Sequence, residues 1–278
     1  MTGQTVSPDA TQAARLSAVF ETANAEHRGV LVGCMPAGFP TVARAIDAMR
    51  AMTDAGADVI EVELAYSDPV MDGPVIQRAS EIALAGGVRT ADLLRSVEAI
   101  AGAGATVILM TYWNPIERYG VDRFARDFAA AGGCGIVTPD LIPDEGAEWI
   151  AAADRHDLDR IFLVAPSSTP ARIAATVAAC RGFVYATSVM GVTGARDQTS
   201  DAAPDLVARV RAATSVPVCV GLGVRDGAQA AAVAGYADAV IVGSALVRCV
   251  LDNLNDDAAG RAALTRLTAE LAEGVRRR

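Results

Sequence analysis

Three carboxylates that could act in acid–base chemistry lie within one short stretch, Asp58–Gln77 (DVIEVELAYSDPVMDGPVIQ). Its first half alternates with the period of a strand, which places Glu61 and Glu63 on one face and aliphatic residues on the other. A turn-rich segment follows and carries Asp72. Burying carboxylates at the end of a parallel strand costs free energy of folding, so their presence there suggests a functional role. We therefore take this stretch as the candidate catalytic segment.

Two carboxylates beside one substrate can divide the work of acid–base catalysis. A carboxyl group in an apolar site has a raised pKa and can carry a proton, while the other stays ionised and stabilises positive charge. Glu61 and Asp72 are the candidates, although Asp72-Gly73 could be a plain turn and Glu61 could be salt-bridged. Glu63 complicates the assignment because it follows Glu61 on the same face. It either raises a neighbouring pKa by like-charge repulsion or bends outward at the end of the strand.

Three glycine-bearing turns predict a phosphate site in the second half of the chain. They are Gly191-Val192-Thr193-Gly194, Gly221-Leu222-Gly223 and Gly243-Ser244. Glycine lets backbone N–H groups approach an anion closely, and a helix N-terminus adds unpaired donors. Any one of these turns could be a simple tight turn, but each follows a predicted strand.

The elements that must position these residues alternate between strand and helix along the whole chain. We predict a single (β/α)8 barrel over residues 1–278, with an extra N-terminal helix from Ser7-Pro8-Asp9 to about Ala25 and a frayed segment 1–8. Function is then expected in the loops after the C-terminal ends of the strands. The predicted strands are Gly29–Cys34, Asp58–Leu64, Thr106–Thr111, Gly135–Thr138, Arg160–Val164, Phe183–Thr187, Val216–Val220 and Ala239–Val242.

Composition excludes several other classes of function. The net charge of −9 argues against nucleic acid and anionic membranes as partners. Five scattered cysteines without a CxxC pair indicate reduced thiols in a cytoplasmic protein and neither a disulfide framework nor a zinc site. The sequence has no apolar run of transmembrane length and no signal-peptide pattern. With only two histidines, acid–base chemistry has to rest on carboxylates or tyrosine.

These motifs resemble one family closely, the α subunit of tryptophan synthase, in an actinobacterial-like form. The resemblance spans nearly the whole chain, and SDPxxDGPxIQ is its most specific part. It rests on Ile60–Ala79, Asn114–Ile116 (NPI), Pro139–Pro143 (PDLIP), Met190–Gly194 (MGVTG), Gly221–Val224 (GLGV) and Val242–Val247 (VGSALV). It implies a (β/α)8 barrel that cleaves indole-3-glycerol phosphate to indole and glyceraldehyde 3-phosphate. It also implies a β subunit that carries pyridoxal phosphate and receives the indole in an α2β2 assembly, with neither cofactor nor metal in this chain.

The resemblance assigns roles to residues by position. Glu61 and Asp72 match the catalytic acids, and Tyr185 matches a residue beside the substrate. The other matched positions are loop six and the phosphate cradle (Thr193, Gly194, Gly223, Gly243, Ser244), the indole pocket (Met110, Tyr112) and the β-subunit contact (Asp68, Asn114).

Two departures from the family pattern border the expected active site. Glu63-Leu64-Ala65 stands where the family usually has Gly-Val-Pro or Gly-Ile-Pro, which adds bulk and charge beside the catalytic strand and frees a partner-contacting loop. Cys34-Met35 stands where relatives often have Tyr-Leu, in the predicted loop that walls the indole pocket. The departures put rate and partner coupling in doubt, while the phosphate cradle is intact.

Three alternatives to an ordinary catalytic α subunit stay open at this point. The chain could be a stand-alone lyase that releases free indole, or a weakly active regulatory subunit of a β partner in which the Glu63 carboxylate occupies the substrate site. Another phosphate-binding barrel, such as a sugar-phosphate isomerase or epimerase, would explain the cradle but not the SDPVMDGP segment with its two acids.

Overall fold

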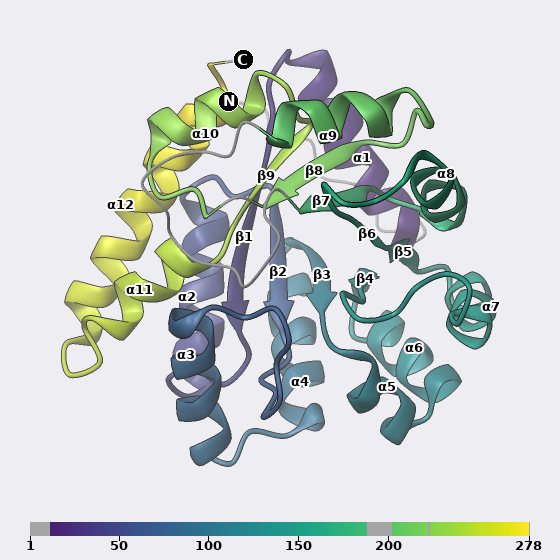
Figure 1. The fold of residues 1–278 in the computed structure, drawn as a ribbon. Coiled ribbons are helices and arrows are strands. Elements are labelled where there is room, and N and C mark those ends of the chain that lie inside the picture. The colour runs from purple at the N-terminus through teal and green to yellow at the C-terminus, as the bar shows by residue number, and fades with distance from the viewer. Residues whose placement is uncertain (1–11, 188–201, 222, 278) are drawn as a thin grey trace.

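Eight strand positions form a parallel barrel at the centre of the molecule (Figure 1). The computed structural model describes residues 12–187, 202–221 and 223–277, and these form nine strand segments and twelve helices. The strands are β1 (Val30–Pro36), β2 (Val59–Glu63), β3 (Thr106–Met110), β4 (Gly133–Val137), β5 (Asp159–Ile161), β6 (Leu163–Val164), β7 (Val184–Thr187), β8 (Val218–Gly221) and β9 (Ala239–Val242).

The order of the strands in the sheet is β5-β4-β3-β2-β1-β9-β8-β7-β6. Its two ends, β5 and β6, are consecutive in the chain and are separated only by the buried Phe162. They are two halves of the predicted fifth strand, so the sheet closes on itself. The predicted (β/α)8 barrel is therefore confirmed, with one strand interrupted.

Helices surround the barrel, and most of them cover the outer face of the sheet (Figure 1). They are α1 (Gln12–Ala25), α2 (Val42–Asp54), α3 (Pro74–Ala85), α4 (Thr90–Ala101), α5 (Trp113–Tyr119), α6 (Val121–Ala130), α7 (Ala147–Arg155), α8 (Pro170–Ala179), α9 (Ala202–Arg211), α10 (Gly227–Ala234), α11 (Ser244–Leu251) and α12 (Asp257–Val275). Within the described ranges, no helix is both long enough and apolar enough to cross a bilayer.

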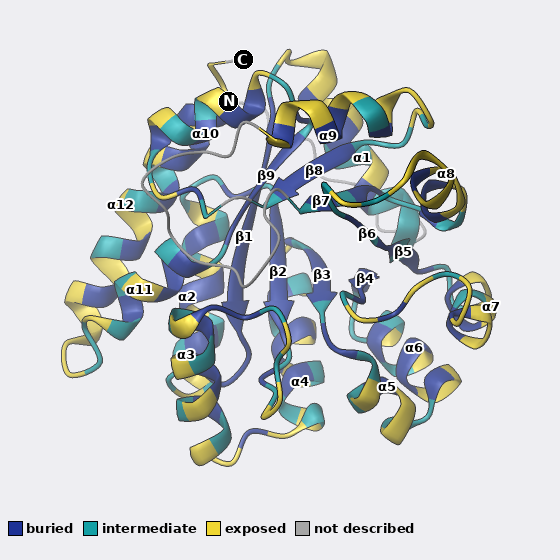
Figure 2. Cartoon of the chain, viewed as in Figure 1, coloured by how far each residue is buried: buried dark blue, intermediate teal, exposed yellow. Residues whose placement is uncertain are grey.

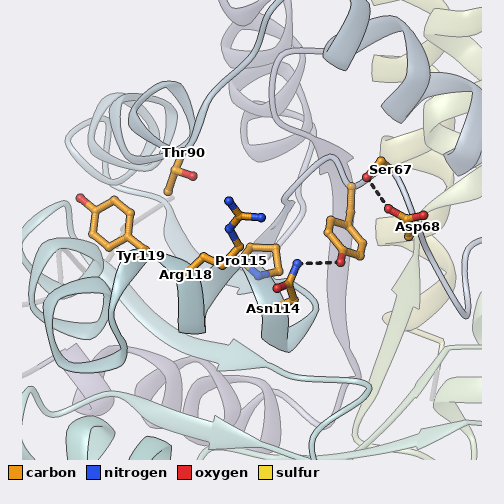
Figure 3. A pocket seen from close by; sticks show the side chains of 8 residues that line it. Ser67, Asp68, Thr90, Asn114, Pro115, Arg118 and Tyr119 are labelled. Atoms are coloured by element: carbon orange, nitrogen blue, oxygen red, sulfur yellow. Dashed lines mark hydrogen bonds between the residues drawn. The ribbon is translucent and has the colours of Figure 1, made fainter.

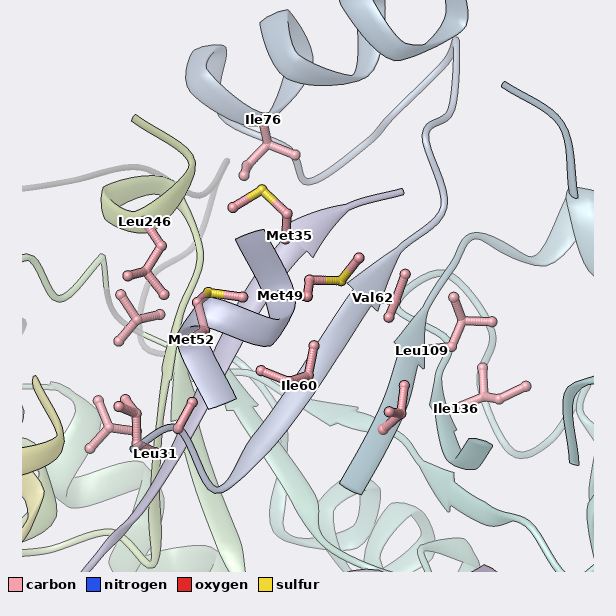
Figure 4. Close-up of a cluster of buried hydrophobic side chains, with 14 of the residues drawn as sticks. Leu31, Met35, Met49, Met52, Ile60, Val62, Ile76, Leu109, Ile136 and Leu246 are labelled. Atoms are coloured by element: carbon pink, nitrogen blue, oxygen red, sulfur yellow. The ribbon is translucent and has the colours of Figure 1, made fainter. Parts of the chain in front are cut away.

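The strands are buried on both faces, as expected for a parallel sheet between helices (Figure 2). The outer face packs against the surrounding helices: Met49 and Met52 of α2 lie over Ile60 of β2 (Figure 4). The inner face fills the barrel with a separate apolar cluster. The alternation along β2 thus sends Ile60 and Val62 outward and Val59 inward.

Helix α1 closes the N-terminal mouth of the barrel. Its residues Leu16 and Phe20 belong to the inner cluster, and Phe20 meets Phe183 just before β7 at a centroid distance of 6.1 Å. The N-terminal mouth is thus sealed with apolar side chains, which leaves the C-terminal mouth for a ligand.

Two sequence predictions are corrected. Strand β1 extends to Pro36, so Cys34 and Met35 lie in the strand and not in a loop. Alternation then sends Met35 outward into the helix-facing core, where it does not wall the barrel interior (Figure 4). Helix α5 was missed because Asn114-Pro115 is typical of a turn; Pro115, however, lies in the first turn of the helix, where a missing N–H costs little.

Candidate active site

Glu61 and Glu63 both lie on the inner face of β2, at the C-terminal end of the strand. Their exposed fractions are 1% and 6%. The alternation predicted this placement for Glu61, whereas Glu63 does not take the outward course that had been an alternative. One donor atom from each carboxylate and the Sγ of Cys34 all lie within 4.8 Å of one another. We call Cys34, Glu61 and Glu63 the thiol–carboxylate cluster.

Cys34 reaches Glu61 because β1 and β2 pair in parallel with these two residues in register. Burial raises the pKa of Glu61 to about 7, and a hydrogen bond with the Cys34 thiol partly opposes that rise. No ion pair to Glu61 exists among the described residues, so the salt-bridged reading of this residue is not supported. A carboxyl group with a pKa near neutrality can give and take a proton at physiological pH.

Glu63 has the least favourable surroundings of the three acids for a negative charge. Burial, the charge of Asp72 and the charge of Glu61 all raise the pKa of Glu63. It also faces the start of α11, since a Cβ placed on Gly243 would lie 3.6 Å from its Oε1. The Glu63 side chain therefore extends from the end of β2 toward the turn where a phosphate group is expected.

Asp72 is held at the same mouth by a tyrosine on the neighbouring loop. The hydroxyl of Tyr112 donates to Asp72 Oδ1 at 2.7 Å and accepts from the backbone N–H of Met71 at 3.1 Å. Asp72 is only 6% exposed, and burial raises its pKa while the Tyr112 hydrogen bond opposes the rise. Gln77 fixes the loop by donating to the Asp72 carbonyl at 2.7 Å. The Asp72 carboxylate thus has a fixed position and a polar partner.

Tyr185 lies on β7, across the barrel from β2, and the described phosphate residues follow β8 and β9. Burial and the nearby acids Glu61 and Glu63 raise the pKa of the Tyr185 hydroxyl, so it stays protonated. The hydroxyl packs on the backbone of Gly221, where any Cβ would overlap it. This close approach explains why position 221, the last residue of β8, is a glycine.

The described part of the predicted phosphate cradle contains Gly223, Gly243 and Ser244. Gly223 has a φ of +68°, which other residues rarely adopt. Gly243 is the N-cap of α11 and Ser244 is its buried first residue, so the free N–H groups of that helix are available near the mouth. Thr193 and Gly194 lie outside the described residues.

The two predicted partner-contact residues lie at the rim of an outer cavity of about 450 Å³ (Figure 3). Asp68 and Asn114 are exposed, and Asn114 Nδ2 donates to the Tyr66 hydroxyl at 2.9 Å. The Tyr66 ring contacts the Tyr112 ring at 5.3 Å, and Tyr112 in turn holds Asp72. A continuous set of contacts therefore connects the outer cavity to a candidate catalytic acid.

Sequence reasoning missed the roles of Cys34 and Tyr66. Cys34 had been noted only as a departure, because its pairing with Glu61 depends on a register between strands that pattern alone does not specify. Tyr66 directly precedes Ser67-Asp68, and its aromatic character within a polar turn was the available signal. Met110, at the end of β3, is half-buried against the inner cluster, on the same side of the sheet as Glu61.

Together the fold and the site define a (β/α)8-barrel protein with acid–base residues at the C-terminal mouth, next to a helix N-terminus suited to an anion. The family model described as tryptophan synthase alpha chain matches residues 20–276. The chain belongs to the tryptophan synthase alpha chain family, as its sequence motifs predict.

Curated and solved relatives support this assignment across the whole barrel. The tryptophan synthase alpha chain of Salinispora arenicola is 67% identical over 94% of this chain and 97% of its own length. A solved tryptophan synthase chain from Mycobacterium tuberculosis is 59% identical, with a TM-score of 0.89, over 94% of this chain and 98% of that chain. The alpha subunit from Legionella pneumophila is 30% identical and still has a TM-score of 0.86, over 94% of this chain and 98% of that chain. The actinobacterial character of the sequence is confirmed by the first two relatives.

Proposed function

We propose that this chain cleaves indole-3-glycerol phosphate to indole and glyceraldehyde 3-phosphate by a retro-aldol reaction. The observation that carries the proposal is the buried Glu61 carboxyl group at the C-terminal mouth of the barrel, which has no ion-pair partner among the described residues, with Asp72 held on the adjoining loop. Membership of the tryptophan synthase alpha chain family supports the choice of substrate.

In the proposed reaction Glu61 moves one proton in each direction. Its protonated carboxyl group gives a proton to indole C3, which makes the ring an electron sink. The resulting carboxylate then takes the proton of the glycerol hydroxyl next to the breaking bond. The C–C bond electrons return to the ring, the hydroxyl carbon becomes the aldehyde, and Glu61 is protonated again.

The other residues bind and orient the substrate in this proposal. Asp72 accepts a hydrogen bond from the indole N–H and stabilises the cationic intermediate, while Tyr185 borders the glycerol chain. Met110 and Tyr112 face the flat ring. The phosphate is held by Gly223, Gly243 and Ser244, together with Thr193 and Gly194. Binding of this remote group helps to place the reacting atoms.

The proposed setting is the cytoplasm, in an assembly with a β subunit that contacts Asp68 and Asn114 and accepts the indole. We expect pyridoxal phosphate in that partner and no cofactor in this chain for the lyase step. The contacts from Asn114 through Tyr66 and Tyr112 to Asp72 provide a physical route by which the partner could affect the acid.

A second function, a weakly active regulatory subunit, is favoured by one observation. Glu63 places an additional carboxylate 3.6 Å from the Cβ position of Gly243, where the substrate phosphate is expected. Burial and the neighbouring acids favour the neutral form of Glu63, so its side chain would hinder the phosphate by its bulk, and by like-charge repulsion when it ionises. Either effect would weaken substrate binding and slow turnover without disturbing the outer surface.

The substitution Glu61→Gln tests the assignment because it keeps the shape of the side chain and removes the transferable proton. We expect indole release to fall by about 10²–10⁴-fold, the usual contribution of a general acid–base group. Binding of indole-3-glycerol phosphate, measured by calorimetry, should stay within a few-fold. Loss of binding in parallel with loss of turnover would contradict the proton-shuttle role and make Glu61 a binding residue.

A further inference from the structure

The thiol–carboxylate cluster has a composition that the family reaction does not need. Cys34, Glu61 and Glu63 converge from two adjacent strands, with one donor atom of each within 4.8 Å of the other two. All three side chains are buried, with exposed fractions of 2%, 1% and 6%. A search for catalytic function in the sequence does not find this grouping, because the cysteine is 27 residues from the first glutamate.

Two oxygens of the cluster have no partner. The Oε2 atoms of Glu61 and Glu63 are fully buried and accept no hydrogen bond in the described part of the protein. Neither carboxylate forms an ion pair with a described arginine, and the Asp72 carboxylate adds further negative charge nearby. Buried carboxyl groups are normally ion-paired, neutralised by a proton or bound to a metal ion, and the described residues supply no cation to this cluster.

The donor set selects among metal ions. A thiolate with two carboxylates suits Zn²⁺, which takes sulfur and oxygen ligands in a tetrahedron. Mg²⁺ and Ca²⁺ prefer coordination by oxygen alone, so the thiol among the three donors disfavours them. Ordinary Zn–S and Zn–O bonds place donor atoms about 3.4–3.6 Å apart, so donor atoms that lie within 4.8 Å of one another have to approach by at most about 1.4 Å.

The cluster offers three protein donors, which leaves one position of a tetrahedral zinc ion without a protein ligand. Gly243 lies beside the cluster, where an added Cβ would lie 3.5 Å from Cys34 Cβ and 3.6 Å from Glu63 Oε1. The cluster lies at the C-terminal mouth, through which a substrate would also enter. Three protein ligands with one open position is the arrangement of reactive rather than structural zinc sites.

Although the cysteine spacing in the sequence argues against a zinc site, we propose that Cys34, Glu61 and Glu63 form a binding site for one Zn²⁺ ion. Binding forms one Zn–S and two Zn–O bonds, and the proton of the Cys34 thiol and any carboxyl proton leave to the buffer. The evidence for this site is the geometry of the cluster, and it does not depend on the lyase reaction. If Glu61 is also the proton shuttle, zinc and catalysis compete for the same carboxylate, and the metal inhibits indole release.

The test is metal binding by the full-length chain after treatment with a chelator. Calorimetric titration with Zn²⁺ should give one site per chain, and Mg²⁺ should give none. Titration with Co²⁺ should produce the near-ultraviolet sulfur-to-cobalt charge-transfer band that reports a thiolate ligand. Neither readout uses substrate, so failure of this proposal and failure of the proposed lyase function are distinguishable.

Three variants locate the site. Glu63→Gln, which is nearly isosteric, should weaken Zn²⁺ binding by at least about 10-fold, and Cys34→Ser should remove the cobalt–sulfur band. Cys249→Ser is the matched control, since this half-buried cysteine of α11 lies outside the cluster; it should bind both metals like the parent chain. Circular dichroism verifies that each variant folds. Absence of a one-to-one site, or unchanged affinity in Glu63→Gln together with an unchanged band in Cys34→Ser, would overturn the proposal.

Discussion

The two mouths of the barrel each bury a carboxyl group, but they surround it differently. At the N-terminal mouth Asp159 begins β5, is 2% exposed and accepts from Arg181 Nε at 3.0 Å. At the C-terminal mouth Glu61 is 1% exposed and has a thiol as its partner, with no ion pair among the described residues. Burial raises the pKa of Asp159 to about 6 and that of Glu61 to about 7.

The difference shows how one fold separates stability from chemistry. At the sealed mouth, Gly135 and Gly182 leave room for Asp159, and a guanidinium offsets its charge. At the open mouth the described residues offer Glu61 no such compensation, and its pKa of about 7 is close to the value of about 6 for Asp159, so the mouths differ more in the partners of the carboxyl group than in its pKa. The separation agrees with the general division of (β/α)8 barrels into a functional and a stabilising face.

After Glu61→Gln, the largest effect is expected from a crowding substitution at the open mouth. In Gly221→Ala the new Cβ would overlap the Tyr185 hydroxyl and displace that ring from the site. A displacement of about 1 Å can cost about 10²-fold in rate, and we expect a loss of that size in steady-state indole release. Gly86→Ala is the control, because Gly86 is an exposed helix C-cap with a φ of −70°. Equal rates of indole release in the two variants would show that the position of the Tyr185 ring does not matter for the reaction.

The second prediction concerns the effect of Asp159, at the sealed mouth, on the pH dependence of stability. The folded pKa of Asp159, about 6, lies above its usual value of 3.8, so the folded state holds this proton more tightly than the unfolded state. Protonation of Asp159 therefore adds to the free energy of unfolding. This contribution is complete below pH 3.8 and is lost as the pH rises through 6. Asp159→Asn removes this dependence while keeping an acceptor for Arg181.

Urea unfolding of the parent chain and of Asp159→Asn at pH 4 and at pH 7 measures this effect. We expect the variant to gain about 2 kcal/mol relative to the parent between the two pH values, with indole release per folded molecule unchanged. If the difference in free energy of unfolding between the parent and Asp159→Asn does not vary with pH, or favours aspartate at pH 7, Arg181 fully compensates the charge.

The smallest effect is expected from the partner of Asp72. Tyr112→Phe removes the 2.7 Å hydrogen bond to Asp72 Oδ1 and leaves the ring in place. A hydrogen bond to a charged group contributes about 1.5–3 kcal/mol, so indole release should fall by at least about 10-fold. Tyr66→Phe is the control, since its hydroxyl serves only the exposed Asn114 in the described structure and should change the rate by less than about 3-fold alone. If the control loses as much activity as Tyr112→Phe, the effect belongs to packing of the two rings.

Local patterns predicted the barrel and the direction of the candidate acids. The period of a strand is fixed by backbone geometry, so the alternation around Glu61 was sufficient to place it inside. The register between β1 and β2 depends on how the whole barrel closes, which is why the contact of Cys34 with Glu61 was not foreseen. For the same reason Met35 was assigned to the pocket wall: the end of β1 is set by its pairing with β2, not by its own residues.

The most direct test of the account is indole release from indole-3-glycerol phosphate by the purified, metal-free chain, with and without the β subunit of a related tryptophan synthase. We predict slow release by the chain alone and much faster release by the mixture, because Glu61 is in place and the partner acts through the loops around Asp72. A folded chain that releases no indole in either assay would contradict the catalytic role of Glu61 and leave Glu63 as the residue that prevents the reaction.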